Sequence, residues 1–154
     1  MSIEVNGIKE TLFTFLTETF ESGKNPQGTV YLDRKSGLFE SIAALSAEAA
    51  SRHVIPNGTT IVAQVYHSLY YLEVLERFMQ GNKERANWAE SWQVRSLDEA
   101  GWQDLQKKLR ASYERVCKTL QAQDDWEDKL DTGFAIAIHS AYHLGAIRQM
   151  LKFL

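Results

Sequence analysis

The chain has 154 residues, of which 44% are hydrophobic and 24% charged, and 17 basic against 20 acidic side chains give a net charge of −3. A chain of this length is expected to form one domain whose core is large enough to fold without disulfide or metal support. The interspersed charges argue against a nucleic-acid-binding surface, which needs clustered Lys and Arg.

The first part of the chain predicts one long helix and one short one. The chain has only two prolines and no sustained apolar/polar alternation, which predicts an all-α protein. Apolar residues three and four positions apart then indicate where each helix lies. A first helix is expected at about 3–21 and a loop at about 23–37. Ser36 is a candidate cap for one extra short helix at about 37–51.

The central part of the chain predicts a long buried helix at about 59–80. The turn before it offers Asn57 or Thr59 as an acceptor for free backbone amides at the helix start. Apolar residues occupy two sides of this helix, which indicates that it packs between neighbours. A polar loop follows at about 82–95.

Two further long helices complete the pattern. The third is expected at about 97–123, where Ser96 and Glu99 have the spacing of a capping box. The fourth is expected at about 131–153. Four long helices of similar length predict a four-helix bundle, and we interpret 1–154 as a single domain.

Three of the four histidines lie on helix faces that are expected to be buried. His139 and His143 are four residues apart, so their rings project one turn apart from the same face of the last helix, and His67 lies near the middle of the second long helix. Neutral imidazoles are costly to bury unpaired, and a divalent metal removes that cost by accepting a lone pair from each. We therefore predict a metal site at His67, His139 and His143. His53, in a turn beside Arg52, is expected at the surface.

Other interpretations of these histidines stay open. Each could be a core residue hydrogen-bonded to a backbone carbonyl, and two of them could ligate a haem. Ser140 stands where His-Glu-x-x-His proteases carry their general base, so that route of peptide hydrolysis is not expected. A three-histidine site with open positions for water or substrate instead suits Lewis-acid chemistry or the lowering of the pKa of a bound water or thiol.

Several other side chains are candidates for supporting or lining such a site. Glu73 and Asp131 could accept an imidazole N–H. Cys117 has no second thiol nearby and is interpreted as a packing residue, so any reacting thiol is expected to come from outside the chain. No catalytic residue is assigned. The candidate pocket residues are Tyr66, Tyr70, Tyr71, Arg148 and Met150, with Trp88 or Trp92 as a lid.

The histidine segments resemble a known family. A His in the middle of the second long helix, followed by His139-Ser-Ala-Tyr142-His143-Leu-Gly145-Ala-Ile147-Arg148, resembles the pattern of the DinB-like (YfiT-like) four-helix-bundle metalloproteins. The resemblance covers essentially the whole chain. Ala146 departs from it, because many relatives have Gln there.

The resemblance implies a function for the histidines. It makes His67, His139 and His143 the metal triad, with nickel or zinc as the usual ion, and it implies a homodimer. Family members with an assigned activity use small thiols, as in thiol S-transferases, and others are called hydrolases. We therefore expect a metal-dependent enzyme that activates a small thiol or water for transfer to a small electrophile. The alternatives are a metal-dependent hydrolase and a non-catalytic binding or stress-response protein with a vestigial site.

The expected location and partners follow from the same features. The chain shows no secretory signal and no apolar run long enough to span a membrane, and a single cysteine favours a reducing compartment. We expect a cytoplasmic protein that binds a small-molecule substrate, with neither nucleic acid nor membrane as a partner.

Overall fold

The computed structural model describes residues 5–23, 28–124, 126 and 129–154, and within these ranges all regular structure is helical. The predicted all-α class is therefore confirmed. The first two residues of the helix expected at 3–21 lie outside the described residues. The elements are α1 (Val5–Glu21), α2 (Leu38–Ala43), α3 (Ala47–Ala50), α4 (Ile61–Met79), the 3-10 helix η1 (Glu90–Trp92), α5 (Glu99–Gln121) and α6 (Leu130–Leu151).

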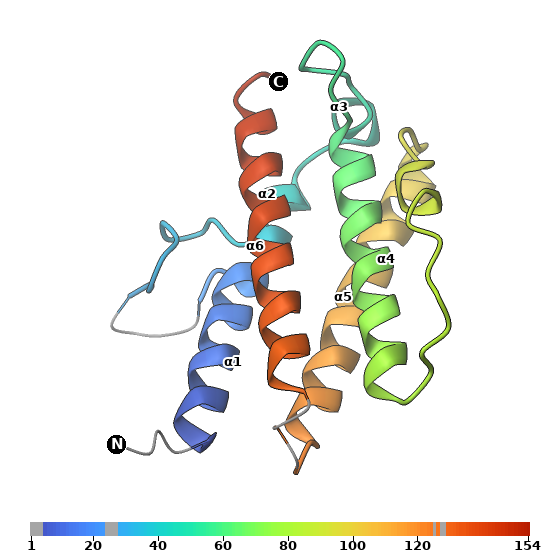
Figure 1. The fold of residues 1–154 in the computed structure, drawn as a ribbon. Coiled ribbons are helices and arrows are strands. Elements are labelled where there is room, and N and C mark those ends of the chain that lie inside the picture. The colour runs from blue at the N-terminus through green and yellow to red at the C-terminus, as the bar shows by residue number, and fades with distance from the viewer. Residues whose placement is uncertain (1–4, 24–27, 125, 127–128) are drawn as a thin grey trace.

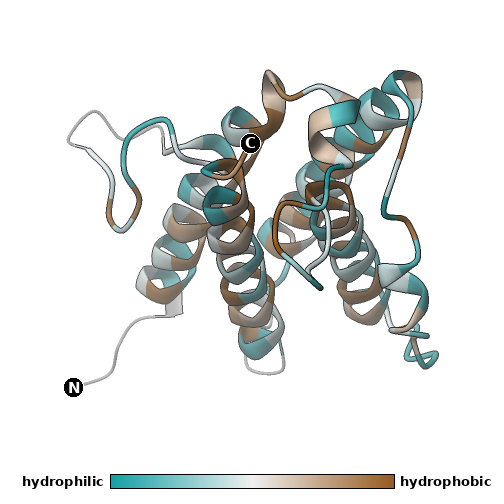
Figure 2. Ribbon diagram, turned by 90° about the horizontal axis from the view of Figure 1, so that it is seen from above, coloured by the Kyte–Doolittle hydropathy of each residue, from teal (hydrophilic) through white to brown (hydrophobic). Residues whose placement is uncertain are grey.

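The four long helices form a bundle in which α6 lies between α1 and α4, and α5 packs against α4 (Figure 1). Each long helix carries both hydrophobic and hydrophilic residues when the bundle is viewed from above (Figure 2). The core contains fully buried side chains from all four, and burying each large aliphatic side chain contributes about 1.5–3 kcal/mol. They include Leu12, Leu16 and Phe20 of α1, Leu72 of α4, Leu109 and Leu120 of α5, and Ile136 of α6.

A glycine sets the distance between the first and last long helices. A Cβ atom at Gly133 of α6 would lie 2.5 Å from Cδ2 of Leu12, so any other residue there would require the Leu12 side chain to shift. Helix α6, which packs against α1 here, carries two of the three candidate ligands.

The extra short helix expected at 37–51 is two helices, α2 and α3. The break occurs because Ser46 starts a new helix, where its hydroxyl accepts the Ala49 amide. The carbonyl of Leu45, just before the break, accepts the indole N–H of Trp102 at 2.7 Å. In a continuous helix the Ala49 amide would pair with the Leu45 carbonyl, and at the break the Ser46 hydroxyl and the Trp102 indole pair with them instead.

The predicted helix caps were wrong in detail. Helix α4 is capped by Thr60, whose hydroxyl accepts the Ala63 amide, and not by Asn57 or Thr59. Ser36 does not cap α2, which begins after Gly37 without a side-chain cap.

The capping box predicted for α5 does not form either. Asp98 is the cap, and it accepts the Gly101 amide at 2.8 Å. Glu99 instead accepts the amide of Ala47, because α3 packs close to the start of α5 and offers an unpaired N–H there.

A buried carboxylate on α1 accepts hydrogen bonds from the segment that follows this helix. Glu18, 2% exposed, accepts the backbone amides of Val30, Tyr31 and Leu32 at 2.6–2.7 Å. Burial alone would raise the pKa of Glu18, but these three hydrogen bonds to the charged form outweigh it and hold the pKa below its usual value.

The connection between α4 and α5 folds back over α4, where η1 packs. The loop expected at 82–95 therefore contains a helical turn that brings Ser91 and Trp92 to the middle of α4. Among the helices of the described ranges, none combines the length and the apolar character needed to cross a membrane.

Candidate metal centre

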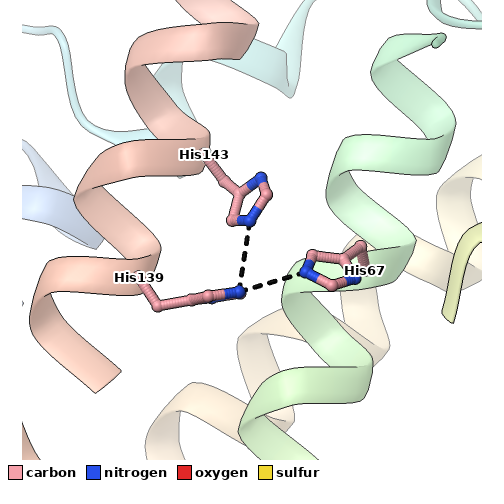
Figure 3. A group of neighbouring side chains, drawn as sticks. All are labelled: His67, His139 and His143. Carbon is pink, nitrogen blue, oxygen red and sulfur yellow. Dashed lines mark hydrogen bonds between the residues drawn. The ribbon is translucent and has the colours of Figure 1, made fainter. Parts of the chain in front are cut away.

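The three histidines predicted from the sequence meet in space. His67 projects from α4, and His139 and His143 project from α6 one turn apart, so the three rings point toward one another across the two helices (Figure 3). Nε2 of His139 lies 3.0 Å from Nε2 of His67 and 3.1 Å from Nε2 of His143. One ligand atom from each residue lies within 4.8 Å of the others, so the group could hold a metal ion.

Aromatic rings hold two of the imidazoles by stacking. Tyr71 lies parallel to His139, with ring centroids 3.5 Å apart, and Trp92 of η1 lies parallel to His67 at 4.0 Å. Stacked aromatic neighbours restrict ring rotation and exclude water from one face of each imidazole. One face of His139 and one face of His67 are therefore covered by aromatic carbon.

The outward nitrogen of His67 is fixed by a serine. Ser91, fully buried, donates its hydroxyl proton to the carbonyl of Trp88, so the same oxygen accepts a hydrogen bond from Nδ1 of His67 at 2.8 Å. A protonated Nδ1 leaves the Nε2 lone pair free, and that lone pair faces the other two rings.

The outward nitrogen of His143 is fixed in the same way by a glutamine. Nδ1 of His143 lies 2.6 Å from Oε1 of Gln64, which accepts its proton and leaves Nε2 free. Gln64 lies on α4, three residues before His67, so the helix that supplies one ligand also orients a second ligand on α6. Nδ1 of His139 is buried and has no hydrogen-bond partner among the described residues.

All three imidazoles are held neutral. Burial lowers the pKa of His67, and burial together with the neighbouring histidines lowers the pKa of His139 to about 3. Burial and His67 lower the pKa of His143 to about 4. Neutral imidazole is the form that binds metals, so near neutral pH the cluster presents lone pairs rather than protons.

Two of the three nitrogen–nitrogen distances match those around one shared ion, and the third pair lies within 4.8 Å. Two imidazole–metal bonds of about 2.0–2.1 Å place their nitrogens about 2.9 Å apart at a right angle and about 3.4 Å apart at a tetrahedral angle. The observed 3.0 and 3.1 Å fall within this range. Axial haem ligands face each other across a porphyrin, and nitrogens this close leave no room for one between these rings.

The predicted supporting carboxylates do not reach the site. Glu73 and Asp131 are both exposed, six and eight residues from the nearest histidine on their own helices. Nδ1 of His67 and Nδ1 of His143 have Ser91 and Gln64 as their partners instead.

The predicted pocket residues divide into two groups. Trp88 contacts Tyr71 at 5.7 Å and Tyr70 at 5.9 Å between ring centroids, so the loop tryptophans do cover this side of α4. Within the described part of the chain, no hydrogen bond or ring contact joins Tyr66, Arg148 or Met150 to the three histidines; Met150 is buried, and Tyr66 and Arg148 are partly buried.

Two residues that the sequence assigned to other roles also lie outside the site. Cys117 is partly buried against the core, and burial raises the pKa of its thiol to about 11, which leaves it protonated at neutral pH. His53 is exposed, with Nδ1 3.3 Å from the carbonyl of Gly58.

Two other residues were missed by the sequence analysis. Gln64 had a detectable signal, because a residue three positions before His67 lies on the same helix face. Ser91 had none, because it lies in a loop without periodicity and its distance from His67 depends on how that loop folds back.

Comparisons of the chain with protein-family models, curated proteins and solved structures found no match.

Proposed function

We propose that the protein is a divalent-metal-dependent enzyme in which His67, His139 and His143 hold the ion, as the resemblance to the DinB-like family suggests. The observation that carries the proposal is the convergence of three neutral Nε2 atoms, two of which have their outward nitrogens hydrogen-bonded to Ser91 and Gln64. Metal-binding histidines commonly have such partners.

The proposed chemistry is the activation of a small external thiol or of water for transfer to a small electrophile. A bound divalent ion, with nickel or zinc as the candidates, would supply Lewis acidity and lower the pKa of a coordinated thiol or water. The protein's own part is to orient the imidazoles through Ser91 and Gln64 and to exclude water with Tyr71 and Trp92. The proposed thiol comes from solution: Cys117 packs against the core, and burial raises the pKa of its thiol to about 11.

Metal analysis tests the first half of the proposal. Protein purified without chelator should contain, or take up on titration, about one equivalent of a transition metal. Replacing any one triad histidine with alanine should abolish tight binding. His53→Ala is the matched control, because it removes an exposed imidazole outside the cluster. Absence of both resident metal and uptake in the wild-type protein would end the metal hypothesis.

Activity measurements test the second half. The metal-loaded protein is mixed with a panel of small thiols and an alkylating electrophile, and thioether formation is compared with hydrolysis of the same electrophile. Thiol-dependent product that disappears in His139→Ala supports the transferase, whereas thiol-independent hydrolysis supports the hydrolase alternative.

One observation favours a non-catalytic alternative. The hydrogen-bond partners of the three rings are neutral groups, so no carboxylate or amine stands ready there as a general base within the described chain. A binding or stress-response protein would bind metal but would neither join a thiol to the electrophile nor hydrolyse the electrophile. Metal uptake without either activity would favour this alternative.

A further inference from the structure

The connection between α4 and α5 buries little of its own surface. Within 80–96 only Ser91 is buried, and the other residues are exposed or partly exposed. A segment that buries so few side chains opens at a low free-energy cost, so its order depends on a few specific contacts. The hydroxyls of Tyr70 and Thr60 hold its two ends by donating to backbone carbonyls of the segment at 3.0 and 2.6 Å.

The middle of the segment is held by the hydroxyl of Ser91. This hydroxyl has one proton, and two groups lie within its reach: the carbonyl of Trp88 at 2.6 Å and Nδ1 of His67 at 2.8 Å. The backbone amide of Ser91 also bonds to the Trp88 carbonyl, but at 3.3 Å. The hydroxyl therefore makes the shorter of the two bonds that close this turn.

The tautomer of His67 determines where the hydroxyl proton goes. With its own proton on Nδ1, His67 donates to the Ser91 oxygen, and the hydroxyl donates to the Trp88 carbonyl. With its proton on Nε2, His67 would accept at Nδ1, and the hydroxyl would turn away from that carbonyl. An ion bound to Nε2 permits only the first arrangement, because it occupies the lone pair of that nitrogen.

We propose that Ser91 couples the ion held by His67 to the order of segment 86–93, which closes firmly when the ion is bound and opens more readily without it. The inference rests on the proposed metal site but not on the reaction proposed for that site. A ligand shifts an equilibrium only through a difference in affinity between two states. Here the difference is the hydrogen bond between Ser91 and the Trp88 carbonyl, and by the same linkage an opened segment holds the ion less tightly.

The coupling reaches the surface of the protein at Trp88. This side chain is 42% exposed, and its ring packs against Tyr70 and Tyr71 with centroids 5.9 and 5.7 Å apart. Together with Arg85, Ala86 and Asn87 it lines a hollow of about 470 Å³. Binding of the ion would therefore fix the walls of a surface hollow that none of the three ligands lines.

Hydrogen exchange measured by mass spectrometry tests the proposal on the zinc-loaded and the metal-free protein. The amides of Ser91, Trp92 and Gln93 are hydrogen-bonded within the segment. They should exchange about two- to tenfold more slowly with zinc, which is the effect of one net hydrogen bond. The amides of residues 30–32 are the internal control, because they bind to Glu18 of α1 and should exchange equally in both samples.

Two variants separate the coupling from metal binding itself. Ser91→Ala and Gln64→Leu each remove the hydrogen-bond acceptor of one ligand, His67 and His143 respectively, but only Ser91 lies in the segment. At a zinc concentration that saturates both variants, Gln64→Leu should keep the slower exchange on zinc binding, and Ser91→Ala should lose it.

Metal analysis of the same samples distinguishes the possible failures. Equal exchange with and without bound zinc in the wild type would overturn the coupling and leave the metal site standing. An undiminished zinc effect in Ser91→Ala would also overturn it, because the signal would then pass through another contact. A wild-type protein that binds no zinc or other transition metal would overturn both the coupling and the proposed metal site.

Discussion

Replacing Ser91 with alanine should weaken metal binding without disturbing any ligand. The change removes the oxygen that accepts the Nδ1 proton of His67 at 2.8 Å, in a position where Ser91 is fully buried and His67 is 7% exposed. A buried donor without its acceptor costs about 1–3 kcal/mol. Losing the hydrogen-bond partner of a metal-binding histidine typically lowers metal affinity about 10–100-fold, which corresponds to about 1.4–2.7 kcal/mol.

The assay is a competition titration of the metal-free protein against a coloured chelator at neutral pH. Ser112→Ala is the matched control, because Ser112 is fully buried on α5 and its hydroxyl has no hydrogen-bond partner among the described residues. Ser112→Ala should bind metal as the wild type does. If Ser91→Ala binds metal as tightly as Ser112→Ala, the hydrogen bond to Ser91 does not orient His67 and the reasoning fails.

Three further outcomes are expected. Gln64→Glu places a buried carboxylate against Nδ1 of His143, so the metal-free protein should melt at a lower temperature. The same carboxylate should make His143 a stronger ligand, so chelator competition should show tighter metal binding, and weaker binding would contradict this. The pKa of Glu18 is lower in the folded protein than its unfolded-state value near 4.5, so its ionised form stabilises the fold above pH 4.5 and this stability is lost as the pH falls through the folded-state pKa. Urea unfolding below pH 4.5 should therefore show a shallower loss of stability with falling pH in Glu18→Gln than in the wild type. Gly37→Ala should destabilise the fold by about 1–3 kcal/mol or more, because its Cβ would lie 2.3 Å from the backbone nitrogen of Ser22; an unchanged urea midpoint would refute this.

The helices and the ligands could be predicted because both depend on local spacing. Apolar residues three and four apart located all four long helices, and the four-residue separation placed His139 and His143 on one face. His67 was included because an imidazole is unusual on a buried apolar face. Its distance from α6 depends on how α4 packs against α6, which spacing along one helix does not encode.

The details that the sequence did not reveal all depend on tertiary contacts. Glu99 has the correct spacing for a capping box with Ser96, but the Ala47 amide competes for its carboxylate once α3 packs nearby. Glu73 and Asp131 are chemically suitable partners for imidazole, yet they lie on exposed parts of their helices. Ser91 reaches His67 only after the loop has folded over α4.

The stack between Trp92 and His67 makes the site observable by fluorescence. The indole and imidazole rings are nearly parallel, 14° apart, with centroids separated by 4.0 Å. Two other tryptophans, Trp102 and Trp126, are buried in the core and show no ring contact with the histidines. Trp88, the fourth tryptophan, contacts Tyr71, which itself stacks on His139. An open-shell ion held by His67 would therefore quench the two loop tryptophans, Trp92 most strongly, so that occupancy, binding rate and release could be followed in the unlabelled protein.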